Sequence, residues 1–353
     1  MITTFPASLS LSLSLHNLPG LPVTMSIDAR DLLCAAETGN LVRVKELLNE
    51  GADLGVQNKD GDTALMKASL EGHLEIVRLL LQRGVDPNIQ NKYGSSALLK
   101  ASSRGQLQTI RLLLHMGADP NLQQNDGETA LIVAVHHSGV ETLDLLLTNG
   151  ADPNIQCNDG GTALIMAAEN CDMAIARLLL AHGVDSNVQN ADGQTALIVV
   201  VKHSCAGALD LLLTNEADPN IQCNDGDTAM IVAARYGSSD INRLLLTNGA
   251  DPNVQNNDGH TPLIVAAKNG YVDVVNLFLA NRADPYVQDE QGRTALSWAT
   301  ENRHDAVVNI LLHSHTEHFS YYSDIPRALI GDKAVDRMLE NESGESRKRK
   351  ERS

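Results

Sequence analysis

The strongest restriction on the fold of this chain is a six-residue pattern, Asp-Gly-x-Thr-Ala-Leu, that returns at a fixed interval. It is first complete at residues 60–65, and its glycine then recurs every 33 residues without insertion or deletion. The turn glycines are Gly61, Gly94, Gly127, Gly160, Gly193, Gly226, Gly259 and Gly292. A constant period of this length is typical of stacked repeat proteins, in which each unit buries its apolar face against its neighbours. We therefore expect one elongated domain with tails.

Each unit reads as two short helices joined to the next unit by an extended turn, and residues 58–90 are a typical example. Gly61 permits a tight turn, and Thr63 is placed to cap the helix that follows. Gly72 ends this first helix, and a more apolar helix comes next. Pro87 prevents any continuation of the second helix, so the chain runs extended into the following turn.

Two short antiparallel helices with a β-turn finger resemble the ankyrin repeat. The resemblance covers residues 28–315 and rests on the recurring turn and on the aliphatic runs of the second helices. It implies an all-α, ankyrin-repeat solenoid of helix-turn-helix units with β-turn fingers. We expect about nine units, of which the first is atypical because one of its faces meets water.

The chain departs from the family pattern at two positions of the unit. The family motif Thr-Pro-Leu-His becomes Thr-Ala-Leu followed by Met, Leu or Ile, and only Thr261-Pro262-Leu263 keeps the proline. Family members use that histidine in hydrogen bonds between units, so we expect apolar contacts here instead. A second departure is loss of the glycine that ends a helix, at Ser138, Cys171, Ser204, Glu216 and Arg282. These helix ends favour positive φ, so we expect each residue that replaces glycine there to destabilise the helix end by about 1 kcal/mol.

Composition limits the partners and the compartment. The formal net charge is −17, which disfavours binding to nucleic acid or to an anionic membrane surface. No apolar run approaches the roughly 20 residues of a membrane span. Among the five cysteines, Cys157 and Cys223 share a register two units apart. Stacked layers about 10 Å apart keep that pair from bridging, so we expect reduced thiols and an intracellular protein.

The sequence predicts no enzyme, no cofactor and no metal site. It contains no phosphate-cradling glycine loop and no nucleophile elbow. Its Asp and His residues mostly recur once per unit, which indicates a structural role before a catalytic one. His136 and His137 are adjacent on a helix and diverge, and the His313-x-His315-x-x-His318 pattern lacks cysteine partners.

Both termini differ in character from the array. Residues 1–27 form a leader in which serine and leucine alternate, and no Lys or Arg precedes Arg30, so we expect an unstructured leader rather than a secretory signal. Either Met1 or Met25 can be the natural start. Residues 316–353 form a tail with a short helix from Asp324 that lies on the array as a cap, followed by a basic end. The basic cluster, residues 347–352, is either a nuclear-import signal or a solvated charge run.

The resemblance places partner binding on the turn tips and on the exposed ends of the first helices. We transfer these positions to this chain and favour side chains of the kind that anchor interfaces, which selects nine residues. They are Tyr93, Arg104, His136, His137, Lys202, His203, Arg235, Tyr236 and Lys268. The aspartates at the turn tips are interpreted first as turn chemistry.

We expect a monomeric protein–protein interaction scaffold or adaptor that binds partner proteins on its concave surface. Two alternatives stay open. One is a nuclear regulator or cofactor of transcription that uses the basic tail for import, whereas the scaffold itself is expected in the cytoplasm. The other is a substrate adaptor for a ubiquitin ligase or a kinase, although the tail shows no recruitment motif. The sequence does not name the partner, because the fold fixes the shape of a binder and leaves its target open.

Overall fold

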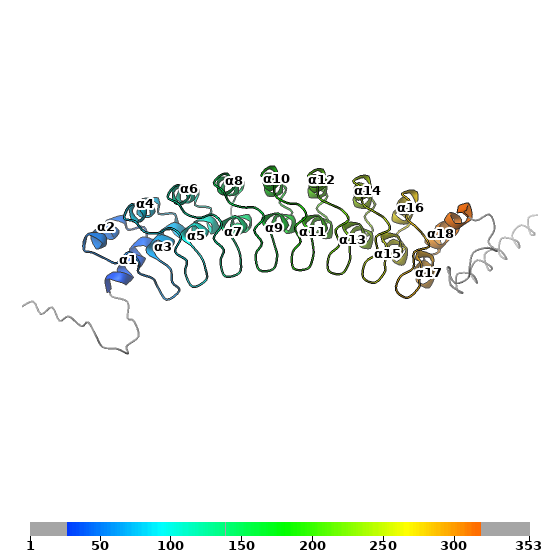
Figure 1. The fold of residues 1–353 in the computed structure, drawn as a ribbon, viewed down its shortest axis with the longest axis horizontal. Coiled ribbons are helices and arrows are strands. Elements are labelled where there is room, and N and C mark those ends of the chain that lie inside the picture. Colours follow the sequence, from blue (N-terminus) through cyan, green and yellow to red (C-terminus); the bar gives the residue numbers. More distant parts are fainter. Residues whose placement is uncertain (1–26, 138, 319–353) are drawn as a thin grey trace, which may run out of the picture.

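The computed structural model describes residues 27–137 and 139–318, and these residues form a single arched stack of helix pairs (Figure 1). The described ranges contain eighteen helices and no strand, apart from an isolated bridge between Gln57 and Thr63. The all-α repeat architecture predicted from the period is therefore confirmed. We call each helix pair a unit and number the units 1–9 along the chain.

The first helix of each unit lies on the concave side of the arch, next to the loops that we call fingers (Figure 1). These inner helices are α1 (Ile27–Glu37), α3 (Ala64–Glu71), α5 (Ala97–Ser103), α7 (Ala130–His137), α9 (Ala163–Glu169), α11 (Ala196–Lys202), α13 (Ala229–Tyr236), α15 (Pro262–Asn269) and α17 (Ala295–Glu301). Each inner helix begins next to a finger, so its C-terminal end lies away from that finger.

The second helix of each unit lies on the convex side (Figure 1). These outer helices are α2 (Leu41–Asn49), α4 (Leu74–Gln82), α6 (Leu107–His115), α8 (Val140–Thr148), α10 (Met173–Ala181), α12 (Ala206–Thr214), α14 (Ser239–Thr247), α16 (Val272–Ala280) and α18 (Asp305–His318). The short helices are stabilised mainly by packing on neighbouring units, because isolated helices of this length are marginal in water.

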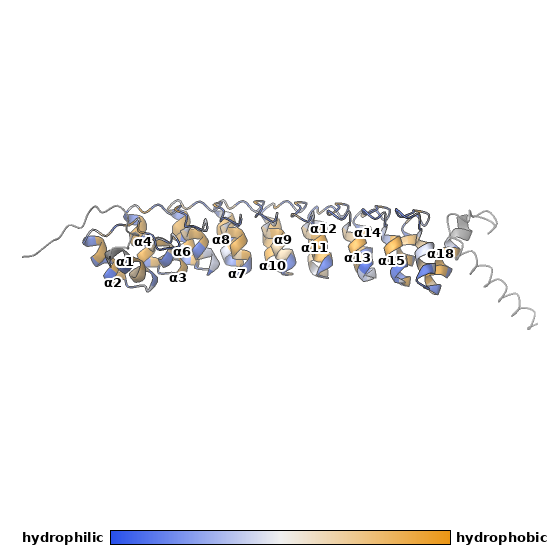
Figure 2. Cartoon of the chain, turned by 90° about the horizontal axis from the view of Figure 1, so that it is seen from below, coloured by the Kyte–Doolittle hydropathy of each residue, from blue (hydrophilic) through white to orange (hydrophobic). Residues whose placement is uncertain are grey.

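One aliphatic core runs the length of the stack. Figure 2 shows hydrophobic colours concentrated in the helices and hydrophilic colours along the fingers. The family's histidine position is filled by apolar side chains that are almost fully buried, among them Met66, Ile132 and Ile231. Apolar contact thus replaces hydrogen bonding at this position, as the sequence analysis predicts.

Helix ends follow the local chemistry of the sequence. Thr63 Oγ1 accepts a hydrogen bond from Met66 N at 3.2 Å, and Gly72 ends α3 with φ +77°. Where glycine is replaced, the backbone still takes the left-handed angle, with φ +64° at Glu216 and +66° at Arg282. Arg303, at φ +61°, is a further such position that the sequence analysis did not identify.

The fingers are tied to one another by side-chain amides. Gln156 Nε2 donates to Gln189 O, one unit further on, at 2.9 Å, and equivalent glutamines repeat this bond along the stack. The asparagine at each finger base also crosses the junction. Asn121 Oδ1 accepts from Asp152 N at 2.8 Å, and its Nδ2 donates to Gly150 O at 3.1 Å. These asparagines therefore connect neighbouring units.

The expectation of five reduced thiols is wrong for one pair. The structure joins Cys171 to Cys205 by a disulfide, with their Cα atoms 5.9 Å apart, while Cys34, Cys157 and Cys223 are free. The prediction considered only two cysteines in the same register. This pair is separated by 34 residues, which is one unit plus one position. Cys171, at the end of the inner helix α9, therefore meets Cys205 in the loop between α11 and α12 of the next unit.

Several predictions concern residues outside the described ranges. The leader of residues 1–27 lies there except for Ile27, which is the first residue of α1. The tail beyond residue 318, including the helix expected from Asp324 and the basic cluster of residues 347–352, also lies outside them.

Candidate partner-binding face

The ends of the inner helices form a row along the concave face. In most units the capping Thr starts the inner helix at the same register, so the same two positions end it. We call these positions the helix-end row. From unit 2 to unit 9 they hold Leu70 and Glu71, Ser103 and Arg104, His136 and His137, Glu169 and Asn170, Lys202 and His203, Arg235 and Tyr236, Lys268 and Asn269, and Glu301 and Asn302.

Eight of the nine residues selected from the sequence lie in the helix-end row, and the ninth, Tyr93, lies on a finger. All are exposed except Lys268, which is half-buried. Tyr93 and Tyr236 are the two most exposed large aromatic side chains among the described residues, at 59% and 55%. Tyr93 belongs to unit 3 and Tyr236 to unit 7, so three units separate them and they do not form one patch.

Arg235 has a structural partner as well as an exposed position. Its Nη2 lies 2.6 Å from Asp227 Oδ2, and the Asp227 side chain is only 6% exposed. Asn256 Nδ2, from the next finger, donates to Asp227 Oδ1 at 2.8 Å. A buried carboxylate left without its cation is costly, so Arg235 contributes to stability as well as to the surface.

Lys268 takes part in an aromatic cluster that the sequence analysis missed. Its Nζ lies 3.9 Å from the centroid of the Trp298 ring, and Arg293 Cζ lies 3.6 Å from the same centroid. Trp298 Nε1 donates to Asp289 Oδ2 at 2.8 Å. Both cations therefore lie at cation–π distance from one indole ring. The sequence could have pointed to this cluster, because Trp298 occupies an inner-helix position that is valine in units 4, 6, 7 and 8.

His260 borders this cluster and is held in its neutral form. Its ring meets the Trp298 ring edge-on, with centroids 5.7 Å apart. Burial lowers the pKa of His260, and the charge of Lys268 lowers it further. The pKa of Asp289 is also lowered: burial would raise it, but the hydrogen bonds from Arg293 N and from Trp298 outweigh burial. At neutral pH the cluster therefore carries a carboxylate and two cations.

The histidine pairs do not assemble a metal site in the described part of the chain. The rings of His136 and His137 lie 6.1 Å apart at a tilt of 56°. Residues 27–137 and 139–318 contain no group of three His, Cys, Asp or Glu side chains arranged to hold a metal ion. His313 Nδ1 contacts Asn309 O at 2.6 Å, and the side chains of His315 and His318 lie outside the description.

Comparison with known families decides the class of the protein. The family model described as ankyrin repeats, three copies, matches four overlapping stretches, residues 32–124, 116–190, 172–256 and 243–321. The chain belongs to the ankyrin repeat family. A comparison with curated proteins gives no match. Ankyrin repeats suggest a protein–protein interaction module, and the exposed concave face fits that function.

The fingertips give this ankyrin array a second, acidic row beside the helix-end row. We call it the fingertip row; it comprises Asp60, Asp126, Asp159, Asp192, Asp225 and Asp258. Tyr93 takes the equivalent place in unit 3 and Gln291 in unit 9. From unit 6 to unit 8 the array therefore carries both acidic fingertips and the basic helix ends Lys202, Arg235 and Lys268.

The convex side of the ankyrin array offers a hollow of about 390 Å³ among α4, α6 and α8. Arg78, Arg111 and His115 contribute to its lining, and none of the nine selected residues does. Among the described residues, no helix is both long and apolar enough to cross a bilayer.

Proposed function

We propose that this chain is a non-enzymatic scaffold or adaptor that binds partner proteins on the concave face of its ankyrin array. The observation that carries the proposal is a contrast within the chain itself. Buried positions of the inner helices repeat Ala, Leu and Ile from unit to unit, whereas the helix-end row changes from apolar to acidic, basic and aromatic. A surface whose chemistry varies on a constant scaffold can recognise one partner in preference to others.

Units 6 to 8 are the strongest part of this face. Lys202, Arg235 and Lys268 provide three positive charges in successive units, and Tyr236 adds an exposed aromatic ring beside them. Arg and Tyr are enriched among residues that dominate binding energy. These side chains favour a partner segment that presents carboxylates and an apolar anchor to the helix ends.

The test compares two variants of the full chain in capture experiments from cell lysate. The concave variant carries Lys202→Ala, His203→Ala and Tyr236→Ala, and it spares Arg235 because Asp227 depends on it. The matched convex variant carries Asp210→Ala and Arg243→Ala, both exposed on outer helices of the same units. We expect the concave variant to lose the captured proteins at unchanged circular dichroism, while the convex variant keeps them. Equal capture by both variants would contradict the proposal.

Location is a separate part of the proposal. We infer a monomer in the cytoplasm, without direct binding to nucleic acid or membrane, and a nuclear role as regulator of transcription is the alternative. That alternative depends on the basic cluster of residues 347–352, outside the described ranges. Deletion of this cluster from a tagged chain separates the two, because an unchanged distribution in the cell removes the support for import. A role as adaptor of a ubiquitin ligase or kinase has no specific observation in its favour.

A further inference from the structure

The stacking register places one position of each unit directly against the next unit. The residue that ends an inner helix faces the residue 34 positions later, just before the next outer helix. A β-carbon at Gly237 would meet Tyr271 Cε1 at 2.9 Å, and one at Gly270 would meet His304 Nδ1 at 2.6 Å. Glycine therefore leaves space there for its neighbour's side chain.

Unit 5 uses this contact differently. Cys171 replaces the glycine, keeps the left-handed backbone with φ +54°, and faces Cys205 of unit 6. Their Cα atoms are 5.9 Å apart, which is a usual separation for a disulfide. The pairing thus follows from the register of the whole stack and does not need a local rearrangement.

Accessibility distinguishes this pair from Cys157, whereas Cys34 is exposed and Cys223 is half-buried; what sets the pair apart from those two is its position face to face across a unit junction. Cys171 is exposed and Cys205 is half-buried, so small redox reagents can reach them. Cys157 is buried, and burial together with the neighbouring Asp159 raises the pKa of its thiol to about 11. Because the thiolate is the reactive form, Cys157 is protected from the same reagents.

The junction at this pair lacks the usual glycines on both sides. Ser204, immediately before Cys205, also holds a left-handed angle, with φ +59°. Left-handed residues other than glycine weaken the ends of α9 and α11 at the same place. A covalent link between the units would offset that weakness.

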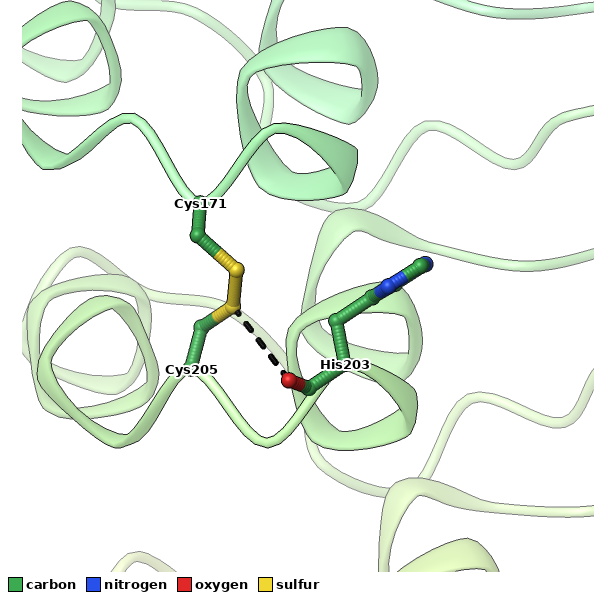
Figure 3. Close-up of a disulfide and its surroundings, with 3 residues drawn as sticks. All are labelled: Cys171, His203 and Cys205. Atoms are coloured by element: carbon green, nitrogen blue, oxygen red, sulfur yellow. Dashed lines mark hydrogen bonds between the residues drawn. A yellow bond between two sulfur atoms is a disulfide. The ribbon is translucent and has the colours of Figure 1, made fainter.

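The two redox states should differ in the contacts of Cys205. In the structure its Sγ lies 3.7 Å from the His203 carbonyl oxygen, and a thiol at this position would have a proton to donate to that oxygen (Figure 3). As a disulfide, the sulfur has no proton to donate and is fixed to Cys171 (Figure 3). His203 and the preceding Lys202 belong to the helix-end row, so the change occurs next to the candidate partner-binding face.

We propose that Cys171 and Cys205 form a reversible, redox-controlled cross-link that fixes the junction of units 5 and 6 and orders the end of α11. Oxidation by a low-molecular-weight disulfide such as oxidised glutathione proceeds in two exchanges. The Cys171 thiolate attacks the reagent, forms a mixed disulfide and releases one thiol. The Cys205 thiolate then attacks the Cys171 sulfur, closes the protein disulfide and releases a second thiol. Two protein thiols are oxidised, one reagent disulfide is reduced, and the two protons end on the released thiols.

The test uses the full chain equilibrated at a series of oxidised-to-reduced glutathione ratios. Free thiols, counted after denaturation, should fall from five to three per chain, and peptide mapping should find the link between Cys171 and Cys205. Amide hydrogen exchange over residues 199–209 should become at least roughly threefold slower in the oxidised form. The thermal midpoint should rise by roughly 5 °C on oxidation.

Two matched variants complete the design. Cys171→Ser keeps the size and the backbone angle of the residue but removes the link, so its exchange and midpoint should not respond to the glutathione ratio. Cys157→Ser with Cys223→Ser should respond as the parent does. A count of five thiols at every ratio, or a link that involves another cysteine, overturns the site. If the link forms but hydrogen exchange is not slower, the proposed ordering of the end of α11 is wrong. None of these readouts needs a partner, so they stand apart from the proposed binding function.

Discussion

At the scale of single residues, backbone angle accounts for the main irregularities of this chain. Five described residues other than glycine hold a left-handed angle, and each stands where most units have glycine at a helix end. Glu216 and Arg282 end outer helices, where the equivalent glycines have open space around them. A β-carbon at Gly150 or Gly249 would have no neighbour within 4 Å. The cost at the two outer-helix positions is therefore conformational rather than steric.

Replacement of Glu216 by glycine should accordingly stabilise the protein. Glu216 has φ +64°, and its carbonyl still accepts the hydrogen bond from Asn187 Nδ2 after the change, because that bond uses the backbone. We expect the free energy of unfolding to rise by about 1 kcal/mol in urea denaturation. The matched change Gly249→Ala should lower it by a similar amount. A loss of stability in Glu216→Gly would mean that the glutamate side chain makes a contact worth more than the strain.

Residue-scale features were predictable from sequence only where the chemistry is local. The Thr63 cap needs only the next three residues, and the helix-ending glycines need only their own backbone angle. The link between Cys171 and Cys205 and the stacking on Trp298 depend on how units are offset in space. The period alone states which residues are equivalent, not which ones touch.

At the scale of elements, the fingers act as a continuous ladder and not as separate loops. Asn220 illustrates the connection: its Nδ2 donates to Gly249 O at 3.1 Å, and its Oδ1 accepts from Asp251 N at 2.8 Å. Both partners belong to the following unit. Each finger base is therefore held by the next unit, which favours cooperative rather than independent behaviour of the fingers.

The change Asn220→Ala should weaken this junction. It removes two hydrogen bonds between units, each worth about 1 kcal/mol, so the free energy of unfolding should fall by roughly 1–2 kcal/mol. The matched control is Asn248→Ala, because Asn248 Nδ2 donates to Leu244 O within its own helix end. Hydrogen exchange should speed up in units 6 and 7 for Asn220→Ala and stay local for the control. Equal, local effects in both variants would show that the ladder does not couple the units.

The elements themselves were largely predictable, while the pairings of the binding face were not. Equal spacing of turn glycines determines helix length and direction, and the structure confirms the helix pairs. The bond of Arg235 to Asp227 joins the end of α13 to the residue that precedes its cap, Thr228. Side-chain length and rotamer decide that contact, and no sequence spacing contains this information.

At the scale of the whole molecule, the arch concentrates negative charge along one edge. The net charge is −17, and the fingertip row repeats a carboxylate in five successive units from Asp126 to Asp258. Neighbouring units are about 10 Å apart, close to the screening length of about 10 Å at 0.1 M salt. Repulsion along the row therefore acts fully at low salt and is largely screened at higher salt. The same field favours partners that carry positive charge toward the fingers.

Stability should consequently increase with ionic strength. We expect the thermal midpoint to rise when sodium chloride is raised from about 20 mM to about 500 mM, because screening removes repulsion that exists only while the units are stacked. The variant with Asp192→Asn and Asp225→Asn keeps the shape of two exposed fingertip side chains but removes their charge. It should be more stable than the parent at low salt and should gain less from added salt. If the parent midpoint falls with salt, attractive ion pairs such as that of Arg235 and Asp227 outweigh the fingertip repulsion. If the variant gains as much as the parent, the repulsion that salt screens lies elsewhere on the array.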